Sequence, residues 1–328
     1  MLNASSIKTL LAVAAFAVAM ASSTSFAQYP NKPIKIVVPF GAGGSADAVA
    51  RGIAQHLEPH IGVPLTVENK AGAGGITGIV HFLAQPDDGH TLLVSTEPQL
   101  SIASFRKQFT MNQLAFINIQ QYEPAQLMVR ADSPHRTIQD LVAFAKAKPG
   151  QLSWSGTSIG SSRVVGESFF KQVGAQVRFI PFDSGSESDL ALLGGHVDAK
   201  AGGIASDLEG IGDKGRMLAV AAAKRVPYAP DVPTFDEVFK AQGVDVPKVG
   251  SARFLAVRAT LKEKHPDRFE KIAQAYRAMY HSEAFQAYLK KSGAMNTAQF
   301  MTPDEAAKNA AEMHKTLEQY KDIAIGGR

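Results

Sequence analysis

A glycine-rich segment is the first place in this sequence where residue types and spacing could do chemistry. The apolar run at 35–38 leads into Gly41, Gly43 and Gly44, and a helical pattern starts directly after them. Glycine permits a tight turn and leaves backbone N–H groups uncovered, while a helix start adds the positive end of a dipole. Together these groups favour the binding of an anion.

Three side chains of the same segment are expected to contribute to that site. Ser45 or Asp47 is predicted to cap the following helix, because short polar side chains accept hydrogen bonds from the first backbone N–H groups. Phe40 adjoins the glycines at the end of the strand, where it would form an apolar wall against a bound molecule or pack into the core.

A second glycine turn repeats this arrangement. It contains Ala73, Gly74 and Gly75 and stands between a predicted strand at 65–68 and a predicted helix at 76–84. In an open parallel sheet such loops meet at the carboxyl ends of the strands, where ligands bind. The sequence therefore predicts two anion-binding loops side by side.

Two enzymatic alternatives share these loops or resemble them. The spacing of Gly41, Gly43 and Ala46, with Glu68 at a later strand end, fits the dinucleotide-binding fingerprint of an oxidoreductase. Short fingerprints also match by chance, and the second glycine loop would crowd the ribose. An export signal, described below, would separate the protein from cytosolic cofactors, so we expect no cofactor.

The other alternative is an exported serine hydrolase that uses Ser158. The order Gly156-x-Ser158-x-Gly160 between a strand and a helix fits a nucleophile elbow. A triad would also need an acid, such as Asp198, and one of three later histidines that no spacing distinguishes, His265, His281 or His314. Without those partners the segment is a polar loop that can bind an anion, and we do not expect an enzyme.

The elements that position these residues follow a doubly wound α/β order. Strands and helices alternate from 32 to 94, and a second alternating series begins after 150. Apolar segments at 116–119 and 126–129 and a return strand at 252–257 connect the two series. Thr137, with Asp140 three positions on, is predicted to cap a helix between the two series. The last part of the chain is predicted to be helical, with one helix at 266–291 and another that starts at Thr302-Pro303-Asp304-Glu305.

Two alternating series of strands and helices, joined by two segments that cross from one to the other, predict a two-lobed clamshell. The first lobe would comprise 28–128 and 253–328, and the second lobe 129–252. The crossings would lie near Val129 and Arg253, and a hinge there would let the lobes close around a ligand.

The N-terminus and the composition place the protein outside the cytoplasm. Residues 1–27 have one charge, Lys8, an apolar run and small residues up to Ala27, as a secretory signal peptide cleaved after Ala27 would have. The chain has no cysteine and a net charge of +4, or +3 without Lys8, with no basic block. We therefore expect a periplasmic monomer without disulfides that does not bind nucleic acid. His56 and His60 have helical ligand spacing, but Pro59 interrupts it and no metal site is predicted.

A series of short motifs connects this chain to a known family. They occur in order along nearly the whole mature chain: Pro39-Phe40-Gly41-Ala42-Gly43-Gly44 with Asp47, Val67-Glu68-Asn69-Lys70, Ala71-Gly72-Ala73-Gly74-Gly75, Pro86-Asp87-Asp88-Gly89, Leu193-Gly194-Gly195-His196-Val197-Asp198 and Pro230-Asp231-Val232-Pro233-Thr234. The sequence resembles the extracytoplasmic solute receptors of tripartite tricarboxylate transporters, the Bug family.

The resemblance implies a type II periplasmic binding-protein fold that delivers a small carboxylate to membrane transport subunits. The loops matching 39–47 and 71–78 would grip one carboxylate of an aliphatic or aromatic mono- or dicarboxylate. The chain departs from the family pattern at Arg163, where histidine is usual, and at 182–185, where Tyr-Lys-Gly is common.

Further ligand contacts are expected where strands end and helices begin. They are Glu97, Trp154, Ser158, Ser161, Ser162, Arg163, Phe182 and Asp183. Trp154 and Phe182 would supply apolar walls or pack into the core, and Glu97 and Asp183 would favour an ammonium or amide group. The guanidinium of Arg163 would bind a distal carboxylate through two parallel hydrogen bonds, or pair with Glu167 one helical turn away.

Overall fold

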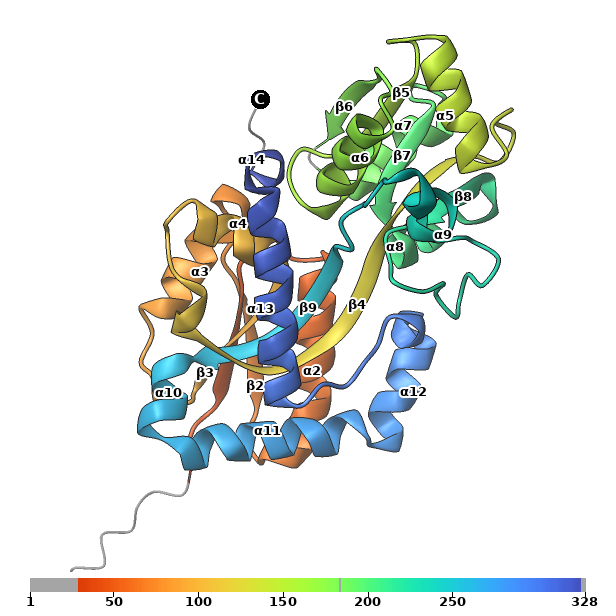
Figure 1. Cartoon of the computed structure of the whole chain (residues 1–328). Coiled ribbons are helices and arrows are strands. Elements are labelled where there is room, and N and C mark those ends of the chain that lie inside the picture. Colours follow the sequence, from red (N-terminus) through yellow and green to blue (C-terminus); the bar gives the residue numbers. More distant parts are fainter. Residues whose placement is uncertain (1–28, 183, 326–328) are drawn as a thin grey trace, which may run out of the picture.

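The structure is a computed structural model that describes residues 29–182 and 184–325. The predicted signal peptide and Asp183 lie outside the described residues. The strands form one sheet in the order β2-β1-β3-β9-β4-β7-β5-β6, with β8 also paired to β4. Figure 1 shows two bodies along this sheet, which we call the first lobe (built on β1, β2 and β3) and the second lobe (built on β5 to β8).

The first lobe is a parallel α/β layer with an antiparallel edge. Its strands β1 (Ile34–Val38), β2 (Leu65–Asn69) and β3 (Thr91–Glu97) are parallel, and β3 pairs antiparallel with β9 (Gly250–Arg258). β1 is an apolar run that the surrounding helices bury, as expected for a central parallel strand. The helices of this lobe are α2 (Ser45–Ile61), α3 (Ile76–Leu83), α4 (Gln99–Phe105), α10 (Ala259–Lys264), α11 (Pro266–Tyr280), α12 (Glu283–Lys291) and α13 (Pro303–Gln319).

The second lobe repeats the α/β order. Its strands are β5 (Ser153–Thr157), β6 (Arg178–Phe182), β7 (Ala199–Gly203) and β8 (Gly215–Val220), and β5 is parallel to both β6 and β7. Its helices are α5 (Ile138–Ala147), α6 (Ser161–Gln172), α7 (Gly185–Leu193), α8 (Ile204–Gly210) and α9 (Phe235–Phe239). Thr137 and Asp140 form the predicted capping box that starts α5.

Two long antiparallel strands cross between the lobes. The two short segments predicted at 116–119 and 126–129 are one strand, β4 (Leu114–Arg130), so their separation is wrong. β4 pairs with β9 as far as Pro124 opposite Gly250, and from Ala125 onward it pairs with β7 and β8. A Cβ atom at Gly250 would lie 2.1 Å from the Glu123 carbonyl oxygen, so only glycine permits this close crossing.

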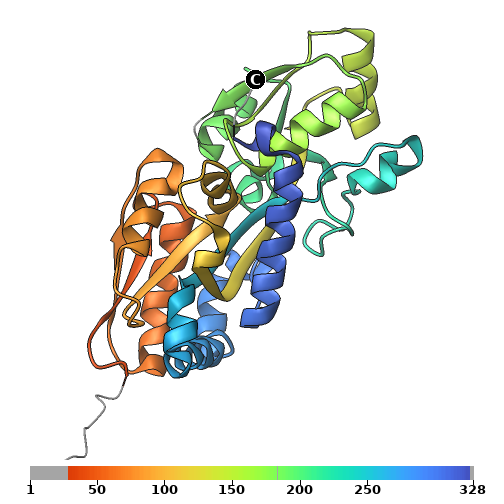
Figure 2. The same ribbon diagram turned by 60° about the vertical axis from the view of Figure 1, so that its left-hand side comes forward.

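A third connection runs through the C-terminal segment. α13 rises along the first lobe, and the short α14 (Lys321–Ala324) contacts α6 of the second lobe, as both ribbon views show (Figures 1 and 2). The Gly160 N–H donates to the Ala324 carbonyl at 3.3 Å, and Arg106, after α4, donates to the Ile325 carbonyl at 3.2 Å. The last described residues therefore bind both lobes.

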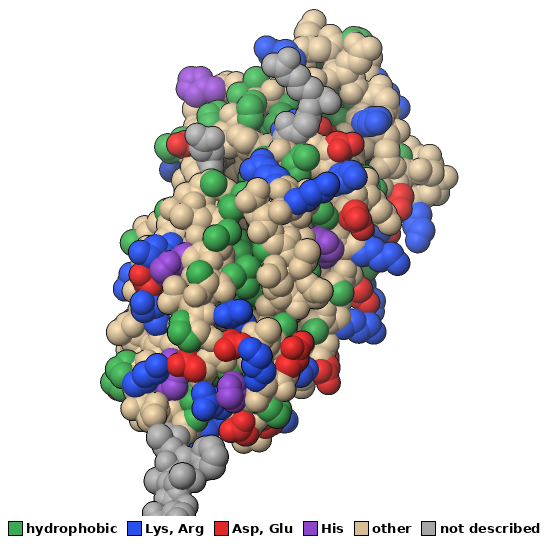
Figure 3. Space-filling model, turned by 90° about the vertical axis from the view of Figure 1, so that its left-hand side faces the viewer, with side chains coloured by type: hydrophobic (Ala, Val, Ile, Leu, Met, Phe, Trp, Pro, Cys, Tyr) green, Lys and Arg blue, Asp and Glu red, His purple; other side chains and the backbone are tan. Residues whose placement is uncertain are grey.

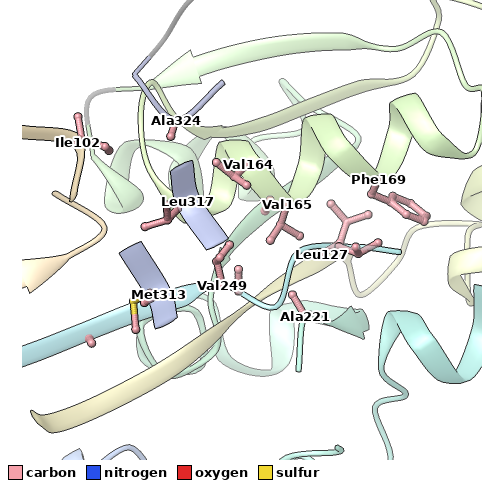
Figure 4. Close-up of a cluster of buried hydrophobic side chains, with 14 of the residues drawn as sticks. Ile102, Leu127, Val164, Val165, Phe169, Ala221, Val249, Met313, Leu317 and Ala324 are labelled. Atoms are coloured by element: carbon pink, nitrogen blue, oxygen red, sulfur yellow. The ribbon is translucent and has the colours of Figure 1, made fainter. Parts of the chain in front are cut away.

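The hydrophobic core is continuous across the junction. One cluster of buried side chains includes Leu127 of β4, Val164 and Val165 of α6, and Met313 and Leu317 of α13 (Figure 4). A second cluster lies in the first lobe between the sheet and the helices α2 and α11. The lobes are thus packed against one another as well as linked by strands.

The helical C-terminal part differs from the prediction, and the surface carries charges of both signs. The single helix predicted at 266–291 is wrong, because the chain breaks at His281 and Ser282 caps α12 by accepting a hydrogen bond from the Phe285 N–H. Figure 3 shows Lys and Arg side chains interspersed with Asp and Glu on one face. Among the described residues, no helix is long and apolar enough to cross a membrane.

Candidate ligand-binding site between the lobes

The first glycine loop is shaped by Asp47. The Asp47 carboxylate accepts a hydrogen bond from Gly43 N at 2.9 Å and one from the Asn69 side chain at 3.0 Å, and Asn69 also donates to the Phe40 carbonyl. Burial alone would raise the pKa of Asp47, but hydrogen bonds from Arg51, Gly43 and Asn69 outweigh burial and lower it. The loop is thus held by an ionised carboxylate beneath it.

The predicted helix cap at this loop is wrong. The residue before α2 is Gly44, and no side chain caps the helix. Asp47 lies inside the first turn and its carboxylate turns back to Gly43. Gly43 has a φ of +83°, and neither it nor Gly41 has an atom within 4 Å of the position that a Cβ would take. The exposed side of the loop therefore faces unfilled space.

The second glycine loop lies beside the first and reaches the other lobe. Ala73, Gly74 and Gly75 have φ values of 48°, 66° and 98°. The Phe40 ring packs against Gly75, with 3.1 Å to the position of a Cβ, so Phe40 joins the two loops. Across the junction, the Ile159 side chain lies 3.8 Å from the corresponding position at Gly74. The second glycine loop and the β5–α6 loop therefore face one another.

A cavity of about 150 Å³ lies between the lobes, and we call it the interlobe cavity. Ser161 and Ser162, both predicted, line it at the start of α6. The other lining residues come from both lobes: Gln99, Glu123, Thr157, Gly160, Gly185, Ser188, Lys200, Ala201, Gly202, Gly203, Asp207, Ser251 and Arg253. A groove of about 570 Å³ on the first lobe, between α10, α13 and the start of β4, is remote from both glycine loops.

An ion pair at the crossing strands lines this cavity. Arg253 Nη1 lies 2.6 Å from Glu123 Oε1, and the two side chains are 11% and 3% exposed. Arg253 Nη2 also donates to Ser45 Oγ at 3.3 Å, which connects the pair to the start of α2. A neighbouring cavity of about 170 Å³ is lined by Ser45, Glu123 and Arg253. Arg253 thus connects the cavity to the first glycine loop.

A second buried ionic cluster lies on the second-lobe side. Lys200 is 1% exposed and donates to the Asp207 carboxylate, and it lies 2.5 Å from Asp189 Oδ1. Gln126 donates to the other Asp207 oxygen. Burial raises the pKa of Asp207 to about 6, although Lys200 acts in the opposite direction.

Sequence reasoning missed the residues of both ionic clusters. A signal was present at Lys200, because it stands between Ala199 and Ala201, and a lysine buried in a strand needs charged or polar partners. Nothing local identified Asp207 or Asp189 as those partners. Glu123 and Arg253 are 130 positions apart, and only the pairing of β4 with β9 brings them together.

Two predicted contacts lie in the interior. Trp154 is 1% exposed and packs against Phe170 and Phe179, so the packing alternative is the one observed. Glu97 is also 1% exposed, and it accepts hydrogen bonds from the Ser101 N–H and hydroxyl at 3.1 Å. Neither residue lines the interlobe cavity.

Arg163 adopts the second of its two predicted arrangements. Its Nε lies 2.7 Å from Glu167 Oε1, and Nη1 donates to the Ser158 carbonyl at 2.9 Å. The guanidinium also stacks over the Phe179 ring at 5.2 Å. These contacts hold the side chain against the second lobe, away from the residues that line the interlobe cavity.

The residues of the enzymatic alternatives have structural partners. Ser158 Oγ donates to the Phe182 carbonyl at 3.0 Å, so the elbow residue and the predicted Phe182 lie together. Glu68, the acid of the dinucleotide fingerprint, pairs with Lys35 and Lys70. Among residues 29–182 and 184–325, no group of three or more His, Cys, Asp or Glu side chains could hold a metal ion.

Comparisons with known proteins agree on one family. The description "Tripartite tricarboxylate transporter family receptor" (TctC) matches residues 49–318. The chain is 32% identical over 276 residues to a protein from the gbd 5' region of Cupriavidus necator, covering 80% of this chain and 81% of that protein. It is 31% identical to Protein BugT of Bordetella pertussis, covering 67% of this chain and 69% of BugT.

Solved structures show the same fold. A TctC solute-binding protein from Polaromonas superposes with a TM-score of 0.72 at 25% identity, covering 90% of this chain and 98% of that one. The fold is also that of MatC from Rhodopseudomonas palustris, described with bound malate, with a TM-score of 0.69 at 22% identity over 90% of this chain and all of MatC. The two-lobed binding-protein fold expected from the sequence is confirmed.

Proposed function

Because this chain belongs to the tripartite tricarboxylate transporter receptor family, we propose that it captures a small carboxylate between its lobes in the periplasm and delivers it to membrane transport subunits. One observation carries the proposal. Two glycine loops at the carboxyl ends of β1 and β2 leave unfilled space at Gly41 and Gly43 and face the second lobe through Gly74. Backbone N–H groups in such loops bind anions without a side chain.

Hinge closure is the proposed motion. The partner change of β4 at Pro124 and Ala125 and the close crossing at Gly250 support a bend ahead of Val129 and beside Arg253. Movement at these positions would bring Ser161 and Ser162 toward the glycine loops. MatC, described with bound malate, shares this fold, which supports a carboxylate as the ligand.

Export and partners complete the proposal. The leader would be removed after Ala27, and the mature monomer would meet its membrane subunits from the periplasmic side. N-terminal sequencing of the protein recovered from the periplasm should begin at Gln28. A protein retained in the cytoplasm with Met1 intact would contradict this assignment.

A thermal-shift screen followed by calorimetry tests the binding function. The panel contains aliphatic and aromatic mono- and dicarboxylates, with NAD and an ester as probes for the enzymatic alternatives. A ligand at 100 times its dissociation constant should stabilise the protein by about 2.7 kcal/mol. If no carboxylate stabilises the protein, the proposal fails. Labelling of Ser158 by a fluorophosphonate would instead favour the hydrolase.

A pair of glycine variants tests the location of the site. Gly43→Leu should weaken carboxylate binding at least tenfold, because its side chain would enter the unfilled space. Gly62→Leu is the matched control, since Gly62 has a φ of +87°, has equally open surroundings and lies at the far end of α2. Both substitutions strain the backbone, so both lower the melting temperature. Equal affinity in the two variants would remove the first glycine loop from the site.

A further inference from the structure

The lining of the interlobe cavity is mostly polar and has little hydrocarbon side chain. Of its described residues, Ala201 alone has an aliphatic hydrocarbon side chain, and none is aromatic. The cavity volume of about 150 Å³ equals that of about five water molecules. Carboxylate pockets for rings or long alkyl chains need apolar walls, because burying apolar surface drives such binding. This lining therefore suits a compact ligand with hydrogen-bonding groups along its length.

The charges at the cavity are already balanced or negative. Arg253 is paired with Glu123, and Lys200 lies between Asp189 and Asp207. The four charged residues that line the cavity, two cations and two carboxylates, balance one another, and Asp189, which does not line it, adds a third carboxylate beside Lys200. An additional carboxylate placed beside them would be buried without a cation of its own, which is costly.

Two glycines bring the ionic clusters up to the cavity wall. A Cβ atom at Gly202 would lie 2.5 Å from Lys200 Nζ, and one at Gly203 would lie 2.6 Å from Glu123 Cδ. Because these positions lack side chains, the backbone of β7 lies directly on both clusters. The charge pairing is thus a built feature of the cavity wall and leaves no cation in excess among its described lining residues.

Hydroxyl groups supply the remaining polar surface. Ser162 Oγ lies 2.7 Å from Thr157 Oγ1, and Ser188 Oγ lies 2.8 Å from Ser155 Oγ. Each hydroxyl has one donor and two acceptor positions. Thr157 Oγ1 donates to the Ile159 carbonyl, so Ser162 Oγ donates to Thr157 Oγ1, accepts from the Thr157 N–H and keeps one acceptor position for a ligand hydroxyl. The pair of Ser188 and Ser155 also keeps further capacity. Ser162 and Ser188 stand at the starts of α6 and α7, on the second-lobe side.

We propose that the interlobe cavity selects a small hydroxylated monocarboxylate, with its hydroxyl groups on Ser162 and Ser188, and disfavours a second carboxylate or a ring. The inference rests on the proposed function, because the glycine loops would hold the single carboxylate. Selectivity arises because ligand hydroxyls replace cavity water with equivalent hydrogen bonds, whereas an anion or a ring does not.

Calorimetry with three four-carbon probes tests this selectivity. 2,3,4-Trihydroxybutyrate should bind at least tenfold more tightly than butyrate or succinate, which lack hydroxyls and, for succinate, add a carboxylate. Succinate or butyrate binding as tightly as trihydroxybutyrate would overturn the inference and leave the carboxylate-receptor function standing. Binding of none of the three would also overturn it, while the wider carboxylate panel decides the receptor function separately.

Serine variants test the assigned contacts. Ser162→Ala and Ser188→Ala should each weaken trihydroxybutyrate binding about three- to tenfold more than they weaken butyrate binding. Ser168→Ala is the matched control, because Ser168 is a buried serine of α6 that does not line the cavity. An unchanged ratio of trihydroxybutyrate to butyrate affinity in both site variants would overturn the assignment of these hydroxyls.

A charge variant tests the exclusion of a second carboxylate. Asp207→Asn keeps a similar shape beside Lys200 and removes one negative charge from the cavity. Succinate affinity should rise at least fivefold relative to butyrate affinity, and a melting curve verifies that the variant is folded. Unchanged succinate affinity in the folded variant would contradict the electrostatic part of the inference.

Discussion

Glu97 should make the protein less stable as the pH rises from acid to weakly alkaline. Burial raises the pKa of this carboxyl group from its ordinary 4.5 to about 8, although hydrogen bonds from Ser101 act in the opposite direction. Below pH 4.5 both the folded and the unfolded states carry the proton. Between pH 4.5 and pH 8 the unfolded state loses the proton and the folded state keeps it, so the free energy of unfolding falls.

The size of this effect follows from the pKa difference. Each pKa unit corresponds to about 1.4 kcal/mol. Because the unfolded group is half ionised at pH 4.5 and the folded group is half ionised at pH 8, Glu97 should cost about 4 kcal/mol at pH 8 relative to pH 4.5. Glu97→Gln is neutral at every pH and retains an oxygen that can accept from the Ser101 N–H. The variant should match wild type within about 1 kcal/mol at pH 4.5 and exceed it by several kcal/mol at pH 8.

Urea denaturation followed by the fluorescence of Trp154, the single tryptophan, measures this difference. The difference between variant and wild type removes the contributions of other groups, including His314, whose pKa burial lowers. Glu305→Gln is the control, because hydrogen bonds from Thr302 lower the pKa of Glu305 and its loss cannot stabilise the protein at pH 8. A difference between Glu97→Gln and wild type that stays constant from pH 4.5 to pH 8 would refute the reasoning.

Three further outcomes are expected. Trp154→Ala, at a site 1% exposed, should cost about 3–5 kcal/mol by urea denaturation monitored by circular dichroism, and Leu190→Ala, at a site 69% exposed, under about 0.5 kcal/mol. Equal costs would contradict the packing. Thr137→Ala removes the acceptor of the Asp140 N–H and should cost about 1 kcal/mol, and an unchanged urea midpoint would show that the cap contributes nothing. Small-angle scattering should show a smaller radius of gyration with a carboxylate identified by calorimetry, whereas an unchanged radius would argue against closure.

Local patterns predicted the glycine loops and several helix starts, because their determinants lie within a few residues. The capping boxes at Thr137 and Thr302 need only a side chain and its neighbour three positions on. The middle of β4 was missed for the opposite reason. Its segment 120–124 is polar and ends in Pro124, which is typical of a loop, yet Gln120 and Glu123 are buried where the two lobes join.

Of the candidate site, the glycine loops could be predicted because the backbone forms them. The sequence places Trp154 and Glu97 near strand ends, but it does not tell whether their side chains point into the core or toward the ligand. The packing of helices against each face of the sheet decides their direction. The partners of Lys200 and Arg253 come from other elements and depend on strand pairing that no local pattern contains. Features that depend on residues close together in the sequence, such as the glycine loops, could therefore be predicted. Ion pairs between residues far apart in the sequence could not.

The C-terminal segment restricts how the lobes can move. Two strands at one place and α14 at another attach the second lobe to the first (Figure 1). A lobe that is attached at two separated places rotates freely only about the line that passes through both attachments. Closure would then be a swing about one axis, and the Gly160 contact with Ala324 could persist while the ends of the lobes far from that line travel the greatest distance.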